Sequence, residues 1–479
     1  MQNSAITRPI YQLSKNKINR TKNNIRKKSK NILDITILVK VLAVLTAIHL
    51  ILFFLPKTIT IISLVIIVAA LFGPPFAVFS VSTIAFIRQL NSEVFVFTES
   101  FGLMGWLLLI ICAIRYLPAT TYYAIKPIIA LSLFSVIATI LTVITSSSVD
   151  VSIMKLLSFY FGSITLFSII GQMNRNQLIM SINYLIAIIL FYLVLSSMTL
   201  LTPSIAFAFN GTAFQGIMNH PQAFGIFLTP ISAYLISSII FSKPKYPVFY
   251  YISALIILTF MVLSQTRTSI AALALSLIST GVLFFIKRRE TIKWGSYIRV
   301  LVSISLISIT TSVVILSSSY IQNQLTAFIF KRESSNLEQA LESRSGGLES
   351  QWNNFLEKPL IGFGFGVYPG DQSSKGIRKY MGIPISAPVE KGFLPAAILE
   401  EVGIVGTIFF IYLIFILTKL VVRSKNIHIC CLYFSCLFIN IGEAVFFSIG
   451  GIGIFFMLLI AMTTQSNRIY KRKQKLVQQ

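Results

Sequence analysis

The stretch Leu-Ile-Ala-Ile-Ile-Leu-Phe-Tyr-Leu-Val-Leu, residues 185–195, has no charged side chain and no alternation of polar with apolar residues. A strand of a membrane barrel alternates between the two, so this run predicts a helix that is apolar on every side. Ile404–Leu417 has the same character. In lipid, unpaired backbone groups find no partner, so segments of this kind are expected to be transmembrane helices.

The composition extends this expectation to the whole chain. Of 479 residues, 55% are hydrophobic and 11% are charged, whereas a soluble domain carries roughly 25% charged residues. We therefore predict an all-α polytopic membrane protein with about 12–14 transmembrane helices, most of them long enough to cross ~30 Å of hydrocarbon. The predicted spans are 35–55, 58–72, 76–90, 101–117, 124–146, 152–171, 178–201, 223–241, 246–264, 268–286, 299–317, 392–418, 428–446 and 447–465.

Basic residues set the expected orientation. The net charge of +25 is concentrated in both ends of the chain and in short connections. Such flanks are topology determinants and contacts for anionic lipid, so nucleic-acid binding is not expected. With both termini cytoplasmic, the basic short connections fall inside, while 146–151, 201–222 and 318–391 fall outside. The predicted location is the cytoplasmic membrane of a bacterium, as a multi-pass protein.

This topology divides the chain into five parts. They are a basic cytoplasmic tail (1–34), a first transmembrane bundle (35–317), a large extracytoplasmic loop (318–391), a last group of helices (392–465) and a second basic tail (466–479). Nine of the 15 acids lie between Glu333 and Glu401, in or just after that loop. Within the loop, 347–356 is expected to form an amphipathic helix, with Leu348, Trp352, Phe355 and Leu356 on one side. All four cysteines lie in apolar runs, and no ligand spacing suggests a metal or a cofactor.

The turn Ser264-Gln-Thr-Arg267-Thr-Ser269 lies at the outer end of two predicted spans. Arg267 could be an interfacial arginine that reaches the lipid headgroups. Alternatively, its planar guanidinium binds two oxygens of a phosphate, with the flanking hydroxyls as further donors.

A second motif begins at Arg344 and continues through Trp352 to Gly362-Phe-Gly-Phe-Gly366. Arg344 is a candidate for a second phosphate contact. The alternating glycines permit a tight backbone, and they are read either as exposed amide donors or as a loop corner packed by Phe363 and Phe365.

A third motif contains Glu390 and, further on, Glu400 and Glu401 within a predicted span. Acids at that depth usually face protein or a water-filled cavity. The simpler interpretation is that Glu400 and Glu401 pair with a basic side chain. Glu390, at the mouth of the span, is a candidate general base with a pKa raised by partial burial.

His220 is the only histidine that this topology places outside. A lone histidine is more often structural, but His220 is a second candidate for the catalytic base. Glu443 is a further acid inside a predicted span, and the sequence suggests no partner for it.

Together, Ser264–Arg267, Arg344 with the glycine run, and Leu399-Glu-Glu-Val-Gly403-Ile-Val-Gly406 resemble the O-antigen ligase and O-antigen polymerase superfamily. The resemblance covers roughly 200–420. It implies a glycosyltransferase that uses polyprenyl-diphosphate-linked glycan on the outer face of the membrane. Arg267 and Arg344 would then contact the donor diphosphate.

Ligases of this family carry a His–Asn pair shortly before the glycine that corresponds to Gly403, but this chain reads Gly392-Phe393 there. Glu390 and His220 are therefore the candidate catalytic residues, and a polymerase is favoured over a ligase. The expected partners are the lipid-linked donor, a glycan or lipid acceptor, membrane lipids and other polysaccharide-assembly proteins. The alternative is a multispanning transporter or flippase with intramembrane Glu400, Glu401 and Glu443 as ion sites.

Overall fold

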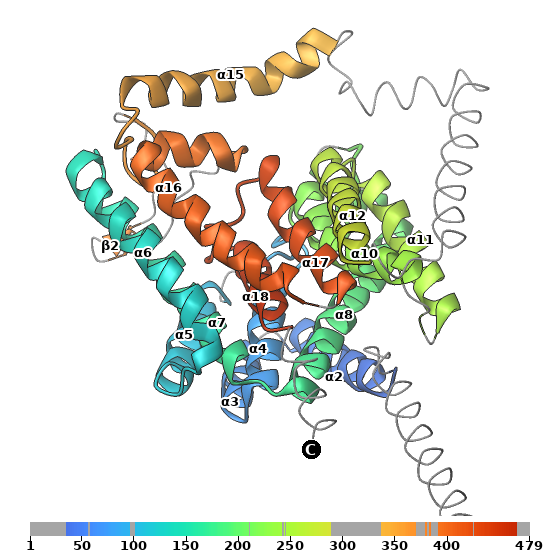
Figure 1. The fold of residues 1–479 in the computed structure, drawn as a ribbon. Coiled ribbons are helices and arrows are strands. Elements are labelled where there is room, and N and C mark those ends of the chain that lie inside the picture. Colours follow the sequence, from blue (N-terminus) through green and yellow to red (C-terminus); the bar gives the residue numbers. More distant parts are fainter. Residues whose placement is uncertain are drawn as a thin grey trace, which may run out of the picture.

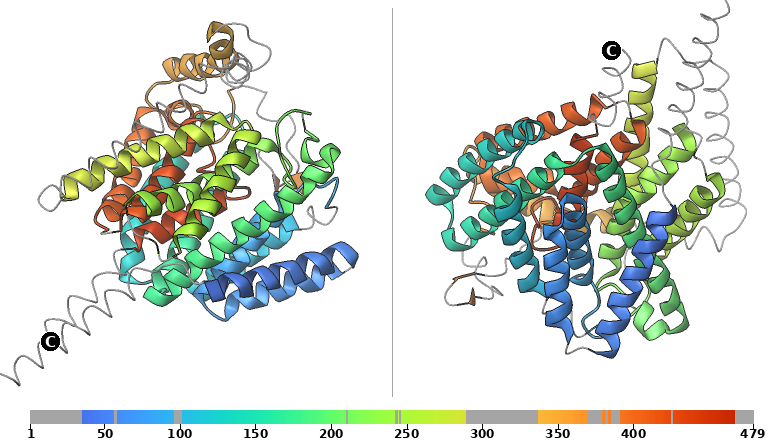
Figure 2. Two further views of the ribbon diagram at one scale, coloured as in Figure 1. Left: turned by 90° about the vertical axis from the view of Figure 1, so that its right-hand side faces the viewer. Right: turned by 90° about the horizontal axis from the view of Figure 1, so that it is seen from below.

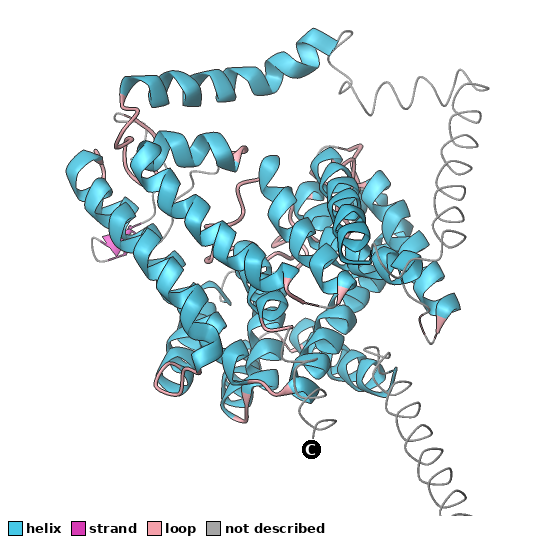
Figure 3. Ribbon diagram, in the orientation of Figure 1, coloured by secondary structure: helices cyan, strands magenta, loops and turns pink. Residues whose placement is uncertain are grey.

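The structure is a computed structural model that describes residues 35–55, 58–95, 101–209, 211–241, 244, 246–288, 337–369, 379–380, 383–384, 391–424 and 426–466. Helices make up 79% of this part of the chain (Figure 3). The sole exception among regular elements in the described ranges is an antiparallel pair of two-residue strands, β1 (Lys379–Tyr380) and β2 (Ile383–Pro384). The prediction of an all-helical membrane protein is confirmed at this level.

Six helices in the described ranges are both long and apolar enough to span a bilayer. They are α6 (Tyr122–Thr145), α7 (Val149–Gln172), α8 (Arg175–Met198, continued by η3, Thr199–Leu201), α10 (Pro221–Phe241), α12 (Arg267–Arg288) and α16 (Leu394–Val422). Shorter apolar helices accompany them: α2 (Ile35–Phe54), α3 (Ile59–Leu71), α4 (Pro74–Ile87), α5 (Phe101–Tyr116), α11 (Pro247–Leu263), α17 (Ile427–Phe438) and α18 (Gly453–Thr464). The predicted span 299–317 lies outside the described residues.

The last helices of the chain occupy the middle of the bundle (Figure 1). α16 packs against α6, while α17 packs against α10 and α12. α2 lies at the edge of the bundle against α8 (Figure 2). Helices from the first and last thirds of the sequence therefore share one core.

Contacts between connections fall into two sets, one at each end of the bundle. At the predicted outer end, Asn219 N donates to Gln89 O (2.8 Å) and Phe214 N donates to Leu263 O (3.0 Å). At the opposite end, Thr121 Oγ1 donates to Gly171 O (2.7 Å) and Gln465 Nε2 to Tyr123 O (3.0 Å). Each set joins connections that the predicted alternation of spans places on one side of the membrane.

One predicted boundary is wrong. The predicted spans 428–446 and 447–465 are both too long: α17 ends at Phe438, a short 3-10 turn η5 (Ile439–Ile441) follows, and α18 begins only at Gly453. Asn440 explains the break, because its Nδ2 donates to Cys436 O (2.9 Å) and its Oδ1 accepts from Phe446 N (2.8 Å). Glu443 consequently lies in an irregular segment, residues 442–452, and not within a helix.

A helix covers the predicted segment 347–356 and extends beyond it. α15 (Leu337–Glu357) contains the predicted 347–356 segment and lies across the top of the view in Figure 1, beside the first turns of α16. Of the predicted apolar stripe, only Phe355 is buried, whereas Leu348, Trp352 and Leu356 are exposed. The buried side of the helix also includes the polar residue Gln351.

Candidate functional site

A partly buried carboxylate joins three elements at the predicted outer end. Glu443 Oε1 accepts hydrogen bonds from Gln222 Nε2 and from Thr268 Oγ1, the latter at 3.4 Å. Gln222 is the second residue of α10 and Thr268 is the second residue of α12. We call these three residues the Glu443 cluster; Gln222 and Thr268 lie 221 and 175 residues before Glu443 in the chain.

The electrostatics of the cluster follow from the helix ends. The N-terminus of an α-helix carries unpaired N–H groups and a partial positive charge of roughly half an elementary charge. Two such ends, those of α10 and α12, meet at Glu443. The same position therefore stabilises an ionised carboxylate and favours any further anion that reaches it.

Arg267 is the first residue of α12 and is partly buried. The turn before it is held tightly: Gln265 has a φ of 53°, the single positive φ among the described non-glycine residues. Its Nε2 donates to Thr212 O (3.3 Å). Backbone conformations of this kind cost of order 1–3 kcal/mol and cluster at functional sites. The strained turn fixes where α12 begins and hence where Arg267 stands.

The expectation about the flanking hydroxyls is corrected. Ser264 Oγ and Thr266 Oγ1 are buried and bond to each other at 2.9 Å, and Ser264 Oγ also donates to Met261 O at 2.9 Å. They brace the turn and are not free donors for a phosphate. The hydroxyl of Thr268 donates to the carboxylate of Glu443, and the Oγ of Ser269 is buried without a hydrogen-bond partner among the described residues.

His220 caps α10. Its Nδ1 accepts a hydrogen bond from the backbone N–H of Gln222 at 3.0 Å, and its ring packs on Phe209 with centroids 4.1 Å apart. A neutral imidazole that accepts through Nδ1 carries its proton on Nε2. In this arrangement His220 can donate a hydrogen bond from Nε2 but cannot take a proton there. In this structure His220 therefore caps α10, and its role as base stays a prediction.

A second group of charges lies at the start of α16. Lys391 Nζ is 2.7 Å from Glu400 Oε2 and 3.5 Å from Glu401 Oε1, and all three side chains are buried. Asn354 Nδ2, on α15, donates to Glu400 Oε1 at 2.7 Å. We call these four residues the Lys391 cluster. The interpretation that Glu400 and Glu401 pair with a basic side chain is confirmed, and Lys391 is that partner.

The glycine run docks on a kink in α16. Gly403 interrupts the helix with φ 59° and ψ −168°, and Phe363 N and Gly364 N donate to the freed carbonyls of Glu400 and Glu401, both at 2.9 Å. Gly362 has a φ of 69°, and a Cβ there would lie 2.6 Å from the backbone of Glu401. The glycine run and the kink at Gly403 thus form one unit, and Phe365 from the run is fully buried. The close backbone contact between the run and the kink explains why glycine is needed at Gly362 and Gly403.

The backbone next to the Lys391 cluster lies close to the backbone next to the Glu443 cluster. A Cβ built on Gly392 would lie 3.7 Å from the carbonyl oxygen of Gly442. Gly392 follows Lys391 directly, and Gly442 precedes Glu443. The segment before α16 therefore approaches the segment that carries the Glu443 carboxylate.

The remaining predicted site residues are placed only in part. Glu390 lies outside the described residues, although its neighbours Lys391 and Gly392 are described. Arg344 belongs to α15 by its backbone, and its side chain lies outside the described part. Its Cα is roughly 15 Å along the helix axis from that of Asn354. Across the described ranges, no group of three or more His, Cys, Asp or Glu residues could hold a metal ion.

The sequence predicts Glu443 as a buried acid but indicates no partner for it. Its signal was a single acid among apolar residues, which is costly unless it is paired. What the sequence could not supply was that Gln222 and Thr268, each beside a motif already singled out, would face it. The resulting constellation offers a carboxylate to accept a proton and two helix ends that favour an anion, with Arg267 beside them.

Comparison with known proteins adds no assignment: no model of a known protein family matches the chain, and no curated protein matches it.

Proposed function

We propose that this membrane protein is a glycosyltransferase of the O-antigen polymerase type, which extends polyprenyl-diphosphate-linked glycan on the outer face of the bacterial cytoplasmic membrane. The observation that carries the proposal is the Glu443 cluster. It places a carboxylate where α10 and α12 begin, beside Arg267 and beside the segment before α16. The resemblance of Ser264–Arg267 and Leu399–Gly406 to that superfamily supports the same reaction.

In the proposed reaction, Glu443 is the general base. An acceptor sugar hydroxyl gives its proton to the carboxylate of Glu443, and its oxygen forms a bond to the anomeric carbon of the donor. The bond from that carbon to the diphosphate oxygen breaks, and the diphosphate leaves with the electron pair. A carboxylate within reach of the hydroxyl proton is the geometric requirement for this role.

The leaving diphosphate gains negative charge as the bond breaks. Arg267 can bond two of its oxygens, and the N-terminus of α12 adds a positive potential at the same place. Arg344 is retained as a second proposed contact, because it belongs to the loop helix that packs on α16. Glu390 remains the alternative base.

The proposal is tested in a deletion strain complemented with wild-type protein or with Arg267→Ala, Glu443→Gln and Glu390→Gln, each checked for expression. The measured quantity is the chain-length profile of the surface glycan. Loss of long chains, with single lipid-linked repeat units accumulating, supports a polymerase. Long lipid-linked chains that stay unattached indicate a ligase. An unchanged profile in every strain overturns the proposal and favours a transporter.

A further inference from the structure

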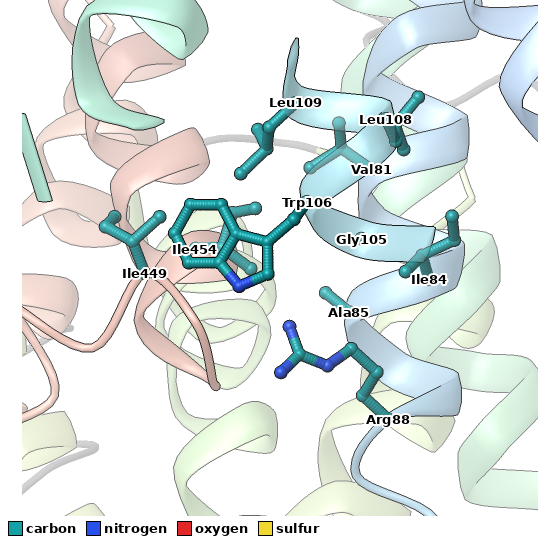
Figure 4. Close-up of a pocket in the computed structure, with 10 residues that line it drawn as sticks. All are labelled: Val81, Ile84, Ala85, Arg88, Gly105, Trp106, Leu108, Leu109, Ile449 and Ile454. Atoms are coloured by element: carbon teal, nitrogen blue, oxygen red, sulfur yellow. The ribbon is translucent and has the colours of Figure 1, made fainter. Parts of the chain in front are cut away.

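A small pocket lies between α4, α5, α18 and the segment that precedes α18 (Figure 4). Eight of its lining residues are apolar or glycine, and two carry polar groups, Arg88 and Trp106. The apolar lining consists of Val81, Ile84, Ala85, Gly105, Leu108, Leu109, Ile449 and Ile454.

Arg88 follows the last residue of α4 and is partly buried. Its guanidinium lies over the backbone of α5, because a Cβ on Gly105 would be 3.4 Å from Nη1. No hydrogen bond or ion pair joins this side chain to any residue in the described ranges. A guanidinium has five N–H donors and no acceptor, and leaving it among apolar groups without a partner is costly.

Trp106 presents a second donor to the same space. In Figure 4 the indole nitrogen is turned toward the guanidinium of Arg88, with Ile449 on the opposite wall. An indole has one N–H and cannot accept, and a buried tryptophan normally gives this hydrogen to a partner. The pocket thus contains donors of two kinds and no side-chain acceptor. A group that completes it has to accept hydrogen bonds, and beside an arginine the charge favours an anion.

The position of the pocket indicates where the anion comes from. Gln89, next to Arg88, is joined to Asn219 at the predicted outer end. The outward side of α5 carries a stripe of exposed apolar residues at helical spacing, namely Leu103, Leu107, Ile110 and Ile114. Such a stripe fits acyl or polyprenyl chains, and tryptophan is typical of the depth at which headgroups lie. A lipid can therefore lay its chain along α5 and its headgroup in the pocket.

We propose that the pocket formed by Arg88 and Trp106 binds the phosphate group of a membrane lipid. The chemistry is a phosphate ester on an apolar chain, whether the lipid is an anionic phospholipid or a polyprenyl diphosphate. The inference does not rest on the proposed glycosyl transfer. The experiment measures lipid binding only, so the lipid-binding proposal can be contradicted without contradicting the glycosyl-transfer proposal, and the reverse.

Trp106 can report on its own site, because the chain has three tryptophans. In the detergent-purified full chain carrying Trp294→Phe and Trp352→Phe, the fluorescence of Trp106 is followed during titration with phosphatidylglycerol, with a polyprenyl diphosphate, and with uncharged diacylglycerol. The expected result is a saturating change for at least one phosphate lipid and none for diacylglycerol. Whichever lipid saturates at lower concentration is the source of the phosphate.

The same titration in an Arg88→Gln background should show affinity weakened by roughly tenfold or more, as expected when one charged hydrogen bond is lost. The affinity of Arg88→Lys should lie between those of wild type and Arg88→Gln, because an ammonium keeps the charge but lacks the planar pair of N–H donors of a guanidinium. Arg115→Gln, at the other end of α5, is the matched control and should bind as wild type. If Arg88→Gln elutes as a monodisperse protein and binds equally well, or if neither lipid saturates, the proposal is overturned. If Arg88→Gln aggregates, Arg88→Lys decides in the same way.

Discussion

The side-chain amide of Gln222 donates a hydrogen bond to Oε1 of Glu443, a residue 221 positions further along the chain. Thr268 directs its hydroxyl at the same oxygen from a third element. The carboxylate is thereby held where α10 and α12 begin. A change at any of these three side chains alters charge or hydrogen bonding at one point of the predicted outer end.

Glu443→Gln removes the proposed base and keeps the shape of the side chain. We expect turnover of a lipid-linked oligosaccharide by the purified enzyme to fall roughly 10²- to 10⁴-fold, the usual contribution of a general base. The thermal midpoint should change little, because a glutamine oxygen still accepts from Gln222. Glu349→Gln, on the exposed side of α15, is the control and should remain active. If Glu443→Gln turned over at the wild-type rate, the general base would be another residue, and Glu390 would be the first to test.

Arg267→Ala should lower kcat by about 10²- to 10³-fold, because it removes a charged donor aimed at the leaving group. Arg267→Lys should recover part of the loss, since an ammonium cannot bond two oxygens in one plane. Single-turnover kinetics with the lipid-linked donor separate binding from chemistry. Arg423→Ala, an exposed residue at the opposite end, is expected to leave both unchanged; a similar loss there would point to general destabilisation.

Lys391→Met should destabilise the protein more than Glu400→Gln does. Removing the lysine leaves two buried carboxylates without their shared cation, whereas removing Glu400 leaves Lys391 with Glu401 at 3.5 Å. Breaking a buried pair costs roughly 3–5 kcal/mol. Thermal unfolding in detergent gives the ranking, and adding Glu400→Gln to Lys391→Met should restore part of the loss. The reverse order of the two single variants would contradict the geometry.

Gly403→Ala should destabilise the kink by at least about 1–3 kcal/mol, because alanine is strained at positive φ. Its Cβ would also meet the backbone of Leu360. Gly281→Ala in α12 is the matched control, because no atom lies within 4 Å of a Cβ there. That variant should be neutral or slightly stabilising, as alanine is preferred to glycine within a helix. Equal midpoints for the two variants would show that the docked loop contributes little.

The predicted orientation can be tested by cysteine labelling. All four native cysteines are buried, so they give little background. A maleimide that cannot cross the membrane should label Gly346→Cys on α15 in intact cells. It should label Arg423→Cys, after α16, only once the membrane is broken. Both positions are exposed, and the opposite pattern would invert the topology.

The sequence alone determined that this is a helical membrane protein, because burial in lipid demands long apolar helices and little else. The same logic placed most of the helices: the predicted span 178–201 corresponds to α8 with η3, and 223–241 to α10. It failed at 428–465, where hydropathy is continuous but Asn440 ends the helical hydrogen bonding. The apolar composition of a segment predicts that it is buried in lipid or protein, but it does not predict which hydrogen bonds end a helix within it.

Only the tertiary structure decided which polar residues meet. No pattern in the sequence pairs Glu443 with Gln222 and Thr268, because the three residues lie in separate segments of the chain. Nor does any pattern name Lys391, rather than another basic residue, as the partner of Glu400. The meeting of Glu443 with Gln222 and Thr268 depends on which helix ends lie together, and that is set by packing among α10, α12 and α17. The Lys391–Glu400 pair depends on the path of the segment that leads into α16. Hydropathy is a local property of the chain, whereas a charged site in a membrane is made by distant segments that must satisfy one another's buried groups.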